Sequence, residues 1–306
     1  MLWLALTLSL VVGANCEVNS DDFEHWALDP MKNASESLAL CEAEGIRIKK
    51  HMEELDLRPL ADAINLTMLI VDAIGLKTVT KKSLEVLPKS VQNLTIVNNN
   101  IRTINELTFV NLTTKHLNLS SNNIELIDPT AFDFMKALEL LNLDNNKIAI
   151  FNFTFVECPK LRVISLKHNL IKKLSEGTLK NVKHNILTVL LSYNQITEVH
   201  KSAFDVKQFH EVHLDHNQLI NAQLLIRLVK AEFVDLSQNN ITCLPKEFME
   251  NGLSKIKTLN LTGNPLECHC LHDLRRKMRK NVEFQKMSPL VQNINLILPK
   301  NDTTKC

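Results

Sequence analysis

An eight-residue pattern of alternating apolar positions and one fixed asparagine recurs through most of this chain. Its clearest copy is Leu117–Ile124, LNLSSNNI, with the plan apolar-x-apolar-x-x-Asn-x-apolar. Successive copies place the asparagine at positions 22 to 25 residues apart, and only Ile74 departs from asparagine. The nine positions are 74, 99, 122, 146, 169, 194, 217, 239 and 264. The pattern predicts an array of similar units, each packed on its two neighbours.

Each unit is predicted to hold one short strand. Residues two apart on a strand face the same side, so the paired apolar residues face a core. Strands of neighbouring units then pair in parallel about 4.8 Å apart. The asparagine can bond to backbone groups that would otherwise be buried unpaired, whereas Ile74 cannot, and we expect an irregular first coil. The side chains four, two and one residues before each asparagine face the other way.

A second column lies about ten residues after the asparagines and is predicted to pack on the opposite side of the core. The unit after Asn217 lacks a phenylalanine there and reads QLLIRLV, which favours a short helix. The column consists of Phe109, Phe132, Phe155, Leu179, Phe204 and Phe248.

The array resembles the leucine-rich repeat, whose period and L-x-x-L-x-L-x-x-N-x-L plan it shares. The resemblance implies an α/β leucine-rich repeat solenoid of about nine repeats, with a curved parallel sheet on the concave face and loops or short helices on the convex face. The stretch NPLECHC resembles the cysteine-flanked C-terminal cap of extracellular members, and Ile46–Ile48 predicts a capping strand. The expected organisation is a signal peptide at 1–16, an N-terminal cap at 17–64, repeats at 65–266 and a cysteine-containing cap at 267–306.

Secretion is expected from the apolar run Leu2–Val12, which small residues follow, with cleavage after Ala14 or Cys16. No later stretch is long and apolar enough for a membrane span. The net charge of +1 argues against a nucleic-acid partner. Nine sequons predict a glycoprotein: Asn33, Asn65, Asn93, Asn111, Asn118, Asn152, Asn240, Asn260 and Asn301.

The seven cysteines suggest a disulfide framework. Cys243 and Cys268 each lie four residues after a ladder position, so stacked coils would bring them within bonding distance, and we predict a Cys243–Cys268 bridge. Cys270 would then pair with Cys306 and close the cap.

The remaining cysteines leave alternatives open. Cys158 is expected to be a free thiol in the core. Cys41 could pair with Cys16, or could link two chains into a dimer if cleavage removes Cys16. A metal site at Cys268-His269-Cys270 is a weaker alternative.

The concave face carries the candidate ligand-binding residues, which gather in the middle-to-late units. One interpretation is a binding patch centred on the only tyrosine, Tyr193, with histidines that make it pH-sensitive. A second is a metal site from His213, His216 and Asp215 or Asp235, and a third is a plain solvated surface. No sequon occurs between Val163 and Phe233. The candidate set is His168, Tyr193, His213, Asp215, His216 and Asp235.

A basic run in the C-terminal cap could bind a polyanionic glycan or acidic lipid, although a plain solvated face is the favoured interpretation. Leu271, Leu274 and Met278 recur at helical spacing and predict a short capping helix. The run is Arg275, Arg276, Lys277, Arg279 and Lys280.

No catalytic motif stands out, so we expect neither an enzyme nor a cofactor. The chain is similar to the coil-less arthropod haemolymph immune proteins with leucine-rich repeats, which implies a secreted recognition protein of innate immunity that binds a protein or a microbial surface ligand. The alternative is an extracellular-matrix or developmental ligand-binding protein, such as a soluble receptor antagonist, and an enzyme inhibitor is a third class.

Overall fold

The computed structural model describes residues 45–48, 51–60, 65–179, 182, 187–200, 202–204, 208–229, 231–253, 255–287 and 295–297. The predicted signal peptide and most of the predicted N-terminal cap lie outside these residues, as do Asn33, Asn301 and the cysteines at 16, 41 and 306.

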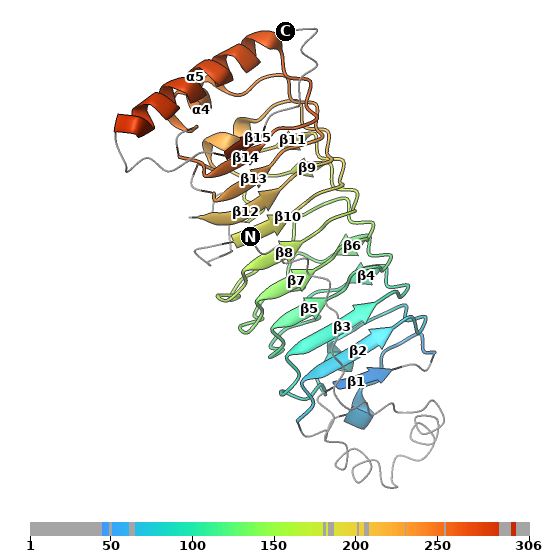
Figure 1. The fold of residues 1–306 in the computed structure, drawn as a ribbon. Helices are drawn as coiled ribbons and strands as arrows, with labels where there is room; N and C mark the ends of the chain where they lie inside the picture. The colour runs from blue at the N-terminus through green and yellow to red at the C-terminus, as the bar shows by residue number, and fades with distance from the viewer. Residues whose placement is uncertain are drawn as a thin grey trace.

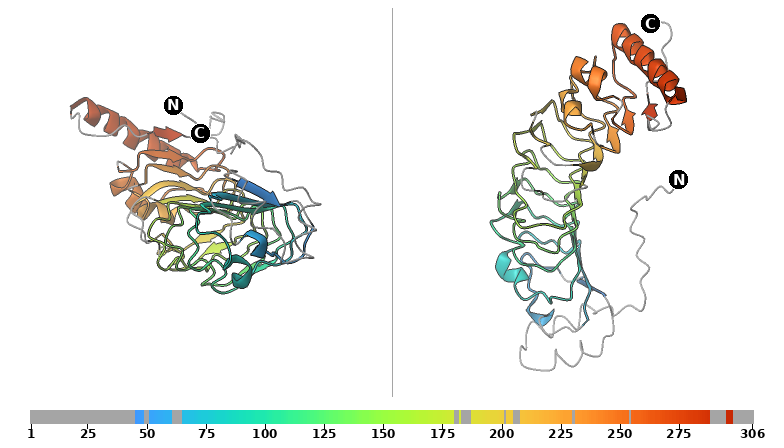
Figure 2. Two further views of the ribbon diagram at one scale, coloured as in Figure 1. Left: turned by 90° about the horizontal axis from the view of Figure 1, so that it is seen from below. Right: turned by 90° about the vertical axis from the view of Figure 1, so that its left-hand side faces the viewer.

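In the part of the chain that the structure describes, eleven parallel strands form one continuous sheet, in which all but the first and last come from the nine predicted repeats (Figure 1). Neighbouring strands in the sheet follow one another along the chain, as expected where each coil packs on the next. The stack of coils bends into an arc (Figure 2). The strands are β1 (Gly45–Ile48), β2 (Met68–Asp72), β3 (Asn93–Val97), β5 (His116–Asn118), β7 (Leu140–Asn142), β8 (Val163–Ser165), β10 (Leu187–Leu190), β12 (Phe209–His213), β13 (Phe233–Asp235), β14 (Thr258–Asn260) and β15 (Asn295–Ile297).

Alternation of apolar residues defines the two faces of the sheet. On β10, Val189 is fully buried while Thr188 and Leu190 are half-buried on the opposite face. Val189 pairs with Val212 of β12 and with Ile164 of β8, so the apolar residues of successive strands form one continuous core column. The predicted strands and their parallel stacking are confirmed.

The asparagines form a buried ladder. Asn146 donates through Nδ2 to the carbonyl oxygens of Leu143 in its own coil and Leu119 in the preceding coil, at 3.0 and 3.1 Å. Its Oδ1 accepts from the backbone N–H of Ile124 at 3.0 Å. Each asparagine therefore satisfies backbone groups of two coils that water cannot reach.

The coil of Ile74 remains regular, which differs from the expectation of irregularity. β2 pairs with all five residues of β3. Asn99 of the next coil accepts from the backbone N–H groups of both Ile74 and Leu76 at 3.1 Å. The apolar Ile74 side chain, 2% exposed, joins the core instead. The predicted capping strand is also present, because β1 pairs in parallel with β2.

The convex side is built from short irregular elements around an aromatic column. All six predicted members of that column are buried, with Phe109 and Phe132 stacked at 5.5 Å between ring centroids. The predicted short helix after Asn217 is a 3-10 turn. The convex and flanking elements are η1 (Arg58–Leu60), α3 (Lys81–Leu84), η2 (Gln223–Ile226), α4 (Lys246–Asn251) and two parallel strand pairs, β4 (Thr103–Ile104) with β6 (Leu126–Ile127) and β9 (Lys173–Leu174) with β11 (Glu198–Val199).

Helix α5 (Cys268–Met287) covers the end of the array beyond β14 (Figure 1). It has 20 residues and is longer than the short helix predicted, because no glycine or proline interrupts the chain between Cys268 and Met287. Leu274 is fully buried and Leu271 is half-buried against the core, so the first turns of the helix seal the last coil. Among the residues that the structure describes, none of the helices combines the length and apolar character that a membrane crossing requires.

Candidate functional site

The residue before each ladder position adopts a left-handed backbone in all nine coils. The φ angles lie between 52° and 57° at the non-glycine positions, from Ala73 to Gln238, and Gly263 has φ 70°. This conformation suits glycine and asparagine and is uncommon for bulky side chains. The backbone therefore projects one side chain per coil at the same place, just beyond the end of each strand.

Three successive coils place rings at this position, and the structure brings them into one stack. The ring of Tyr193 lies between His168 and His216, with centroid distances of 4.4 and 4.1 Å and interplanar angles of 13° and 15°. Tyr193 remains 46% exposed. Ring stacking of this kind is worth about 0.5–1.5 kcal/mol per pair. It offsets part of the cost of holding rings on a left-handed backbone.

Beside the stack, the neighbouring coils of β12 and β13 bring together a histidine and two aspartates. His213 pairs directly with Asp235 in the sheet register, and Asp215 follows two residues after His213 on the same face. One ligand-type atom from each of the three residues lies within 4.8 Å of the others. His216, which the sequence also suggested as a metal ligand, instead contacts Asp215 through Nδ1 at 3.0 Å from Oδ2.

A second charged network lies at the N-terminal ends of β12, β13 and β14 and was not predicted from the sequence. Glu232 lies 3.3 Å from His210 Nδ1 and 3.1 Å from Lys257 Nζ. The hydrogen bond from Lys257, with help from His210, lowers the pKa of the Glu232 carboxyl. His210, Glu232 and Lys257 each lie seven residues before a ladder asparagine, so their shared position was a signal that could have found them.

Asp144 is a further polar residue of the concave face that sequence did not single out. Burial raises the pKa of its carboxyl, while hydrogen bonds from the Ser165 hydroxyl and the Lys167 backbone N–H act in the opposite direction. These bonds reach Asp144 Oδ1 at 2.6 and 2.7 Å. They fix the side chain within the sheet surface.

The sequons on the sheet flank the ring stack rather than cover it. Asn93, Asn118 and Asn260 lie on β3, β5 and β14 and are half-buried. Asn260 also donates to Asp235 Oδ2 at 3.0 Å. The other described sequon asparagines are exposed: Asn65, Asn111, Asn152 and Asn240.

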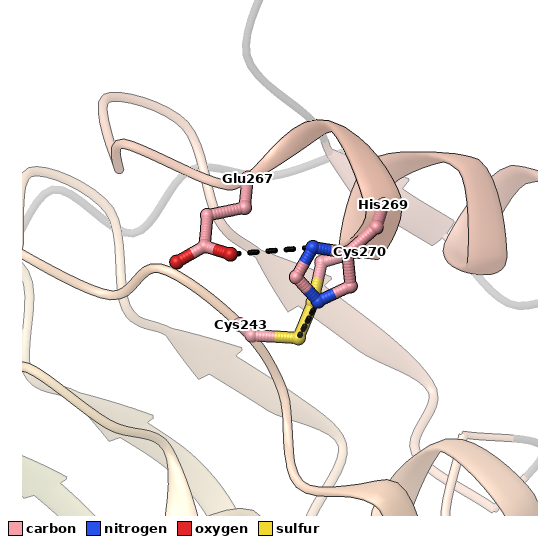
Figure 3. The surroundings of a disulfide bond; sticks show 4 residues. All are labelled: Cys243, Glu267, His269 and Cys270. Atoms are coloured by element: carbon pink, nitrogen blue, oxygen red, sulfur yellow. Dashed lines mark hydrogen bonds and ion pairs between the residues drawn. A yellow bond between two sulfur atoms is a disulfide. The ribbon is translucent and has the colours of Figure 1, made fainter.

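The disulfide at the end of the array joins Cys243 to Cys270, whose Cα atoms are 5.6 Å apart (Figure 3). The predicted Cys243–Cys268 bridge is therefore wrong, and so is the predicted Cys270–Cys306 pair. The chain does not complete another coil after Asn264, because α5 begins at Cys268 and turns Cys270 onto its buried face. Cys268 also takes part in a disulfide.

His269 lies over this disulfide, with Nε2 3.5 Å from Cys270 Sγ and Nδ1 3.2 Å from Glu267 Oε2 (Figure 3). A metal ion would need the sulfurs as thiolates. The bonded sulfurs cannot act in this way, which removes the cysteine metal site considered from the sequence. Cys158, predicted to be free, is free and buried, and burial raises the pKa of its thiol to about 11.

The basic run lies on α5. Arg275 and Lys277 are half-buried and Arg276 is exposed. The Arg276 guanidinium forms an ion pair with Asp273 at 2.6 Å. The side chains of Arg279 and Lys280 lie outside the described residues.

Comparison with known proteins agrees with this architecture. A family model described as Leucine rich repeat matches residues 89–148. Toll-like receptor 9 of Mus musculus is 30% identical over 157 residues, which cover 50% of this chain and 13% of the receptor. Transforming growth factor beta activator LRRC32 of Mus musculus is 26% identical over 190 residues, covering 58% of this chain and 28% of that protein.

Among solved structures, the mouse RP105/MD-1 complex contains a similar chain. The TM-score is 0.61 at 20% identity, over 85% of this chain and 42% of that chain, a likeness that shows the fold. The matched part thus spans less than half the length of each of these three proteins. The asparagine ladder, the parallel solenoid and the match of residues 89–148 to the leucine-rich repeat model together show that this chain is built from leucine-rich repeats.

Proposed function

We propose that the protein is a secreted recognition protein of innate immunity, which binds a protein or microbial surface ligand on its concave face between β8 and β13. The observation that carries the proposal is the stack of His168, Tyr193 and His216 beside the His213, Asp215 and Asp235 group. We call these six residues the concave patch. Catalysis is not part of the proposal, since the patch offers no nucleophile paired with a base.

The ring stack has the properties of a binding hot spot. Hot spots are enriched in tyrosine and lie among groups that a partner can desolvate. Tyr193 is held between two imidazoles and yet keeps 46% of its surface exposed, so its ring loses little conformational freedom on binding. The patch adds carboxylates and imidazoles that can meet charged or hydrogen-bonding groups of a ligand.

The arrangement of sequons favours this location. Glycans on Asn93, Asn118 and Asn260 would stand on the sheet on either side of the patch, over β3, β5 and β14. The strands that carry the patch have no sequon between Val163 and Phe233. A large partner would therefore meet bare protein surface in the middle of the arc.

The similar proteins are consistent with a binding role. Toll-like receptor 9 is a receptor, and RP105 is seen in complex with a second protein, MD-1. We infer the binding role from the concave patch, and the immune role from the resemblance to secreted immune proteins with leucine-rich repeats.

The test is affinity capture of partners from the native extracellular fluid with the purified chain as bait. The informative variant combines Tyr193→Asn with His213→Ala, because asparagine tolerates the left-handed backbone at position 193. His116→Ala is the matched control, since His116 lies on the same face three strands earlier than β10 in the sheet order. We expect a partner retained by the wild type and the control and lost from the double variant. Equal capture by all three proteins would place the binding surface elsewhere.

A second candidate is a matrix or developmental ligand-binding protein, which the basic residues of α5 favour. One similar protein is an activator of transforming growth factor beta. Polyanion binding through Arg275 and Lys277 would be salt-dependent. Retention on heparin that falls when both residues become glutamate would support this function, whereas retention unchanged by the substitutions would count against it.

A further inference from the structure

The group of His213, Asp215 and Asp235 brings ligand-type atoms close enough together to hold a metal ion. The three side chains come from two adjacent coils and bring one nitrogen and two oxygen ligand atoms within 4.8 Å of one another. Zinc is held by imidazole nitrogens and carboxylate oxygens at about 2.0–2.2 Å. Small side-chain rotations could bring atoms so arranged onto a single ion.

The negative charge around His213, Asp215 and Asp235 favours binding of a cation. Among the described residues, no lysine or arginine forms an ion pair with Asp215 or Asp235, and Asp215 has a histidine contact instead, from His216 Nδ1 to its Oδ2. The nearby Lys257 pairs with Glu232. Glu211, whose carboxylate lies 3.0 Å from His213 Nε2, adds further negative charge. Carboxylates placed side by side without a cation repel each other, and a divalent ion relieves that repulsion.

Hydrogen bonds from neighbouring residues also fix the positions of the Asp215 and Asp235 carboxylates. Ser192 Oγ donates to Asp215 Oδ1 at 2.5 Å. The backbone N–H and hydroxyl of Ser237 donate to Asp235 Oδ1 at 2.9 and 2.6 Å, and Asn260 donates to its Oδ2. Metal ligands are typically oriented by such outer hydrogen bonds.

The histidine is oriented in the same way. Glu211 contacts one ring nitrogen of His213, an arrangement that fixes the tautomer and orientation of a metal-binding imidazole. The ring also packs against Phe233, at 5.1 Å between centroids. The side chain of His213 is 25% exposed and that of Asp215 is 15% exposed. The site is thus partly open to solvent.

We propose that His213, Asp215 and Asp235 bind a divalent transition-metal ion of the zinc class on the concave face. Imidazole together with carboxylates suits zinc, cobalt or nickel, whereas calcium and magnesium take oxygen ligands only. Three protein ligands leave a further position on a tetrahedral ion for water or for a group of a bound partner. The metal proposal uses residues of the proposed ligand-binding surface. Metal binding is measured without a partner, so its failure is distinguishable from failure of the proposed ligand binding.

The test is isothermal titration of zinc chloride into the purified chain, with its disulfides intact and its metals removed by a chelator. We expect one zinc ion per chain, bound at least about ten-fold more weakly by Asp235→Asn and by His213→Asn. Asn at position 235 keeps an oxygen that can accept from Ser237, so that variant is designed to retain the fold. His116→Asn is the matched control and should bind zinc as the wild type does. Circular dichroism checks that every variant is folded, and Asp215→Asn replaces any variant that is not.

A cobalt spectrum provides a second measurement that does not depend on variants. Cobalt held by imidazole and carboxylates gives visible absorption without an intense sulfur-to-metal charge-transfer band. The presence of that band would indicate that cysteines bind the metal. The proposal is overturned by absence of zinc binding, by equal binding in the His213 and Asp235 variants, or by a sulfur band.

Discussion

Two rungs of the asparagine ladder differ by a single hydrogen bond, and that bond can be measured. The Nδ2 amide groups of Asn122 and Asn146 each share their two N–H donors among three carbonyl oxygens. Asn146 Oδ1 also accepts from the Ile124 backbone N–H at 3.0 Å, whereas Asn122 Oδ1 is buried without a partner. Alanine at either position removes the three shared bonds. Only Asn146→Ala also leaves a buried N–H without an acceptor.

An unpaired buried donor costs about 1–3 kcal/mol, and the terms common to both substitutions cancel in the comparison. Asn146→Ala should therefore lower the free energy of unfolding by about 1–3 kcal/mol more than Asn122→Ala. Urea unfolding followed by far-UV circular dichroism measures the difference, provided that both variants keep the wild-type m value. Hydrogen exchange should accelerate at the Ile124 amide in Asn146→Ala alone. An equal or larger loss of stability in Asn122→Ala would refute this account of the ladder.

Three further outcomes follow from buried or bonded groups. The Cys158 thiol, with its pKa raised to about 11, should be about one part in a thousand thiolate at pH 8 and should react with iodoacetamide only after unfolding; rapid labelling of the native chain would contradict its burial. Peptide mapping without reduction should recover Cys243 linked to Cys270, and a Cys243–Cys268 peptide would show this pairing to be mistaken. Burial raises the pKa of Asp144 above its unfolded value, so the folded chain binds that proton more readily and the contribution of this group to stability rises as pH falls through the raised pKa. Asp144→Asn removes that rise, so the free energy of unfolding of the variant relative to the wild type should fall as pH is lowered, whereas a pH-independent difference would argue against the shift.

Most of the fold could be predicted because the residue pattern within each repeat specifies the structure of that repeat. Alternating apolar residues define a strand, and the asparagine defines where the strand ends. Stacking then follows from repetition. The same register predicts that His168, Tyr193 and His216 lie in one column, and their rings stack there. Pairing of His213 with Asp235 likewise follows from equal distances to consecutive ladder asparagines.

The failures occur where repetition stops. Cys243 and Cys268 share the same offset from an asparagine, but the second offset falls on a helix rather than a coil, so equal spacing no longer means equal position. The repeat register also does not determine the orientation of a side chain. His216 turns toward Asp215 in one contact, and nothing in the pattern specifies that choice. The network of His210 and Glu232 was missed because its column begins before the recognised pattern.

The Cys243–Cys270 disulfide determines the end of the array from which unfolding begins. A stack of coils held by nearest-neighbour contacts can peel from either end. Here the bond spans 27 residues and encloses the whole coil of β14 in a covalent loop. A loop of that length removes roughly 3–4 kcal/mol of unfolded-state freedom. Peeling should thus proceed from β1 toward β13, and the concave patch lies among the coils that open late.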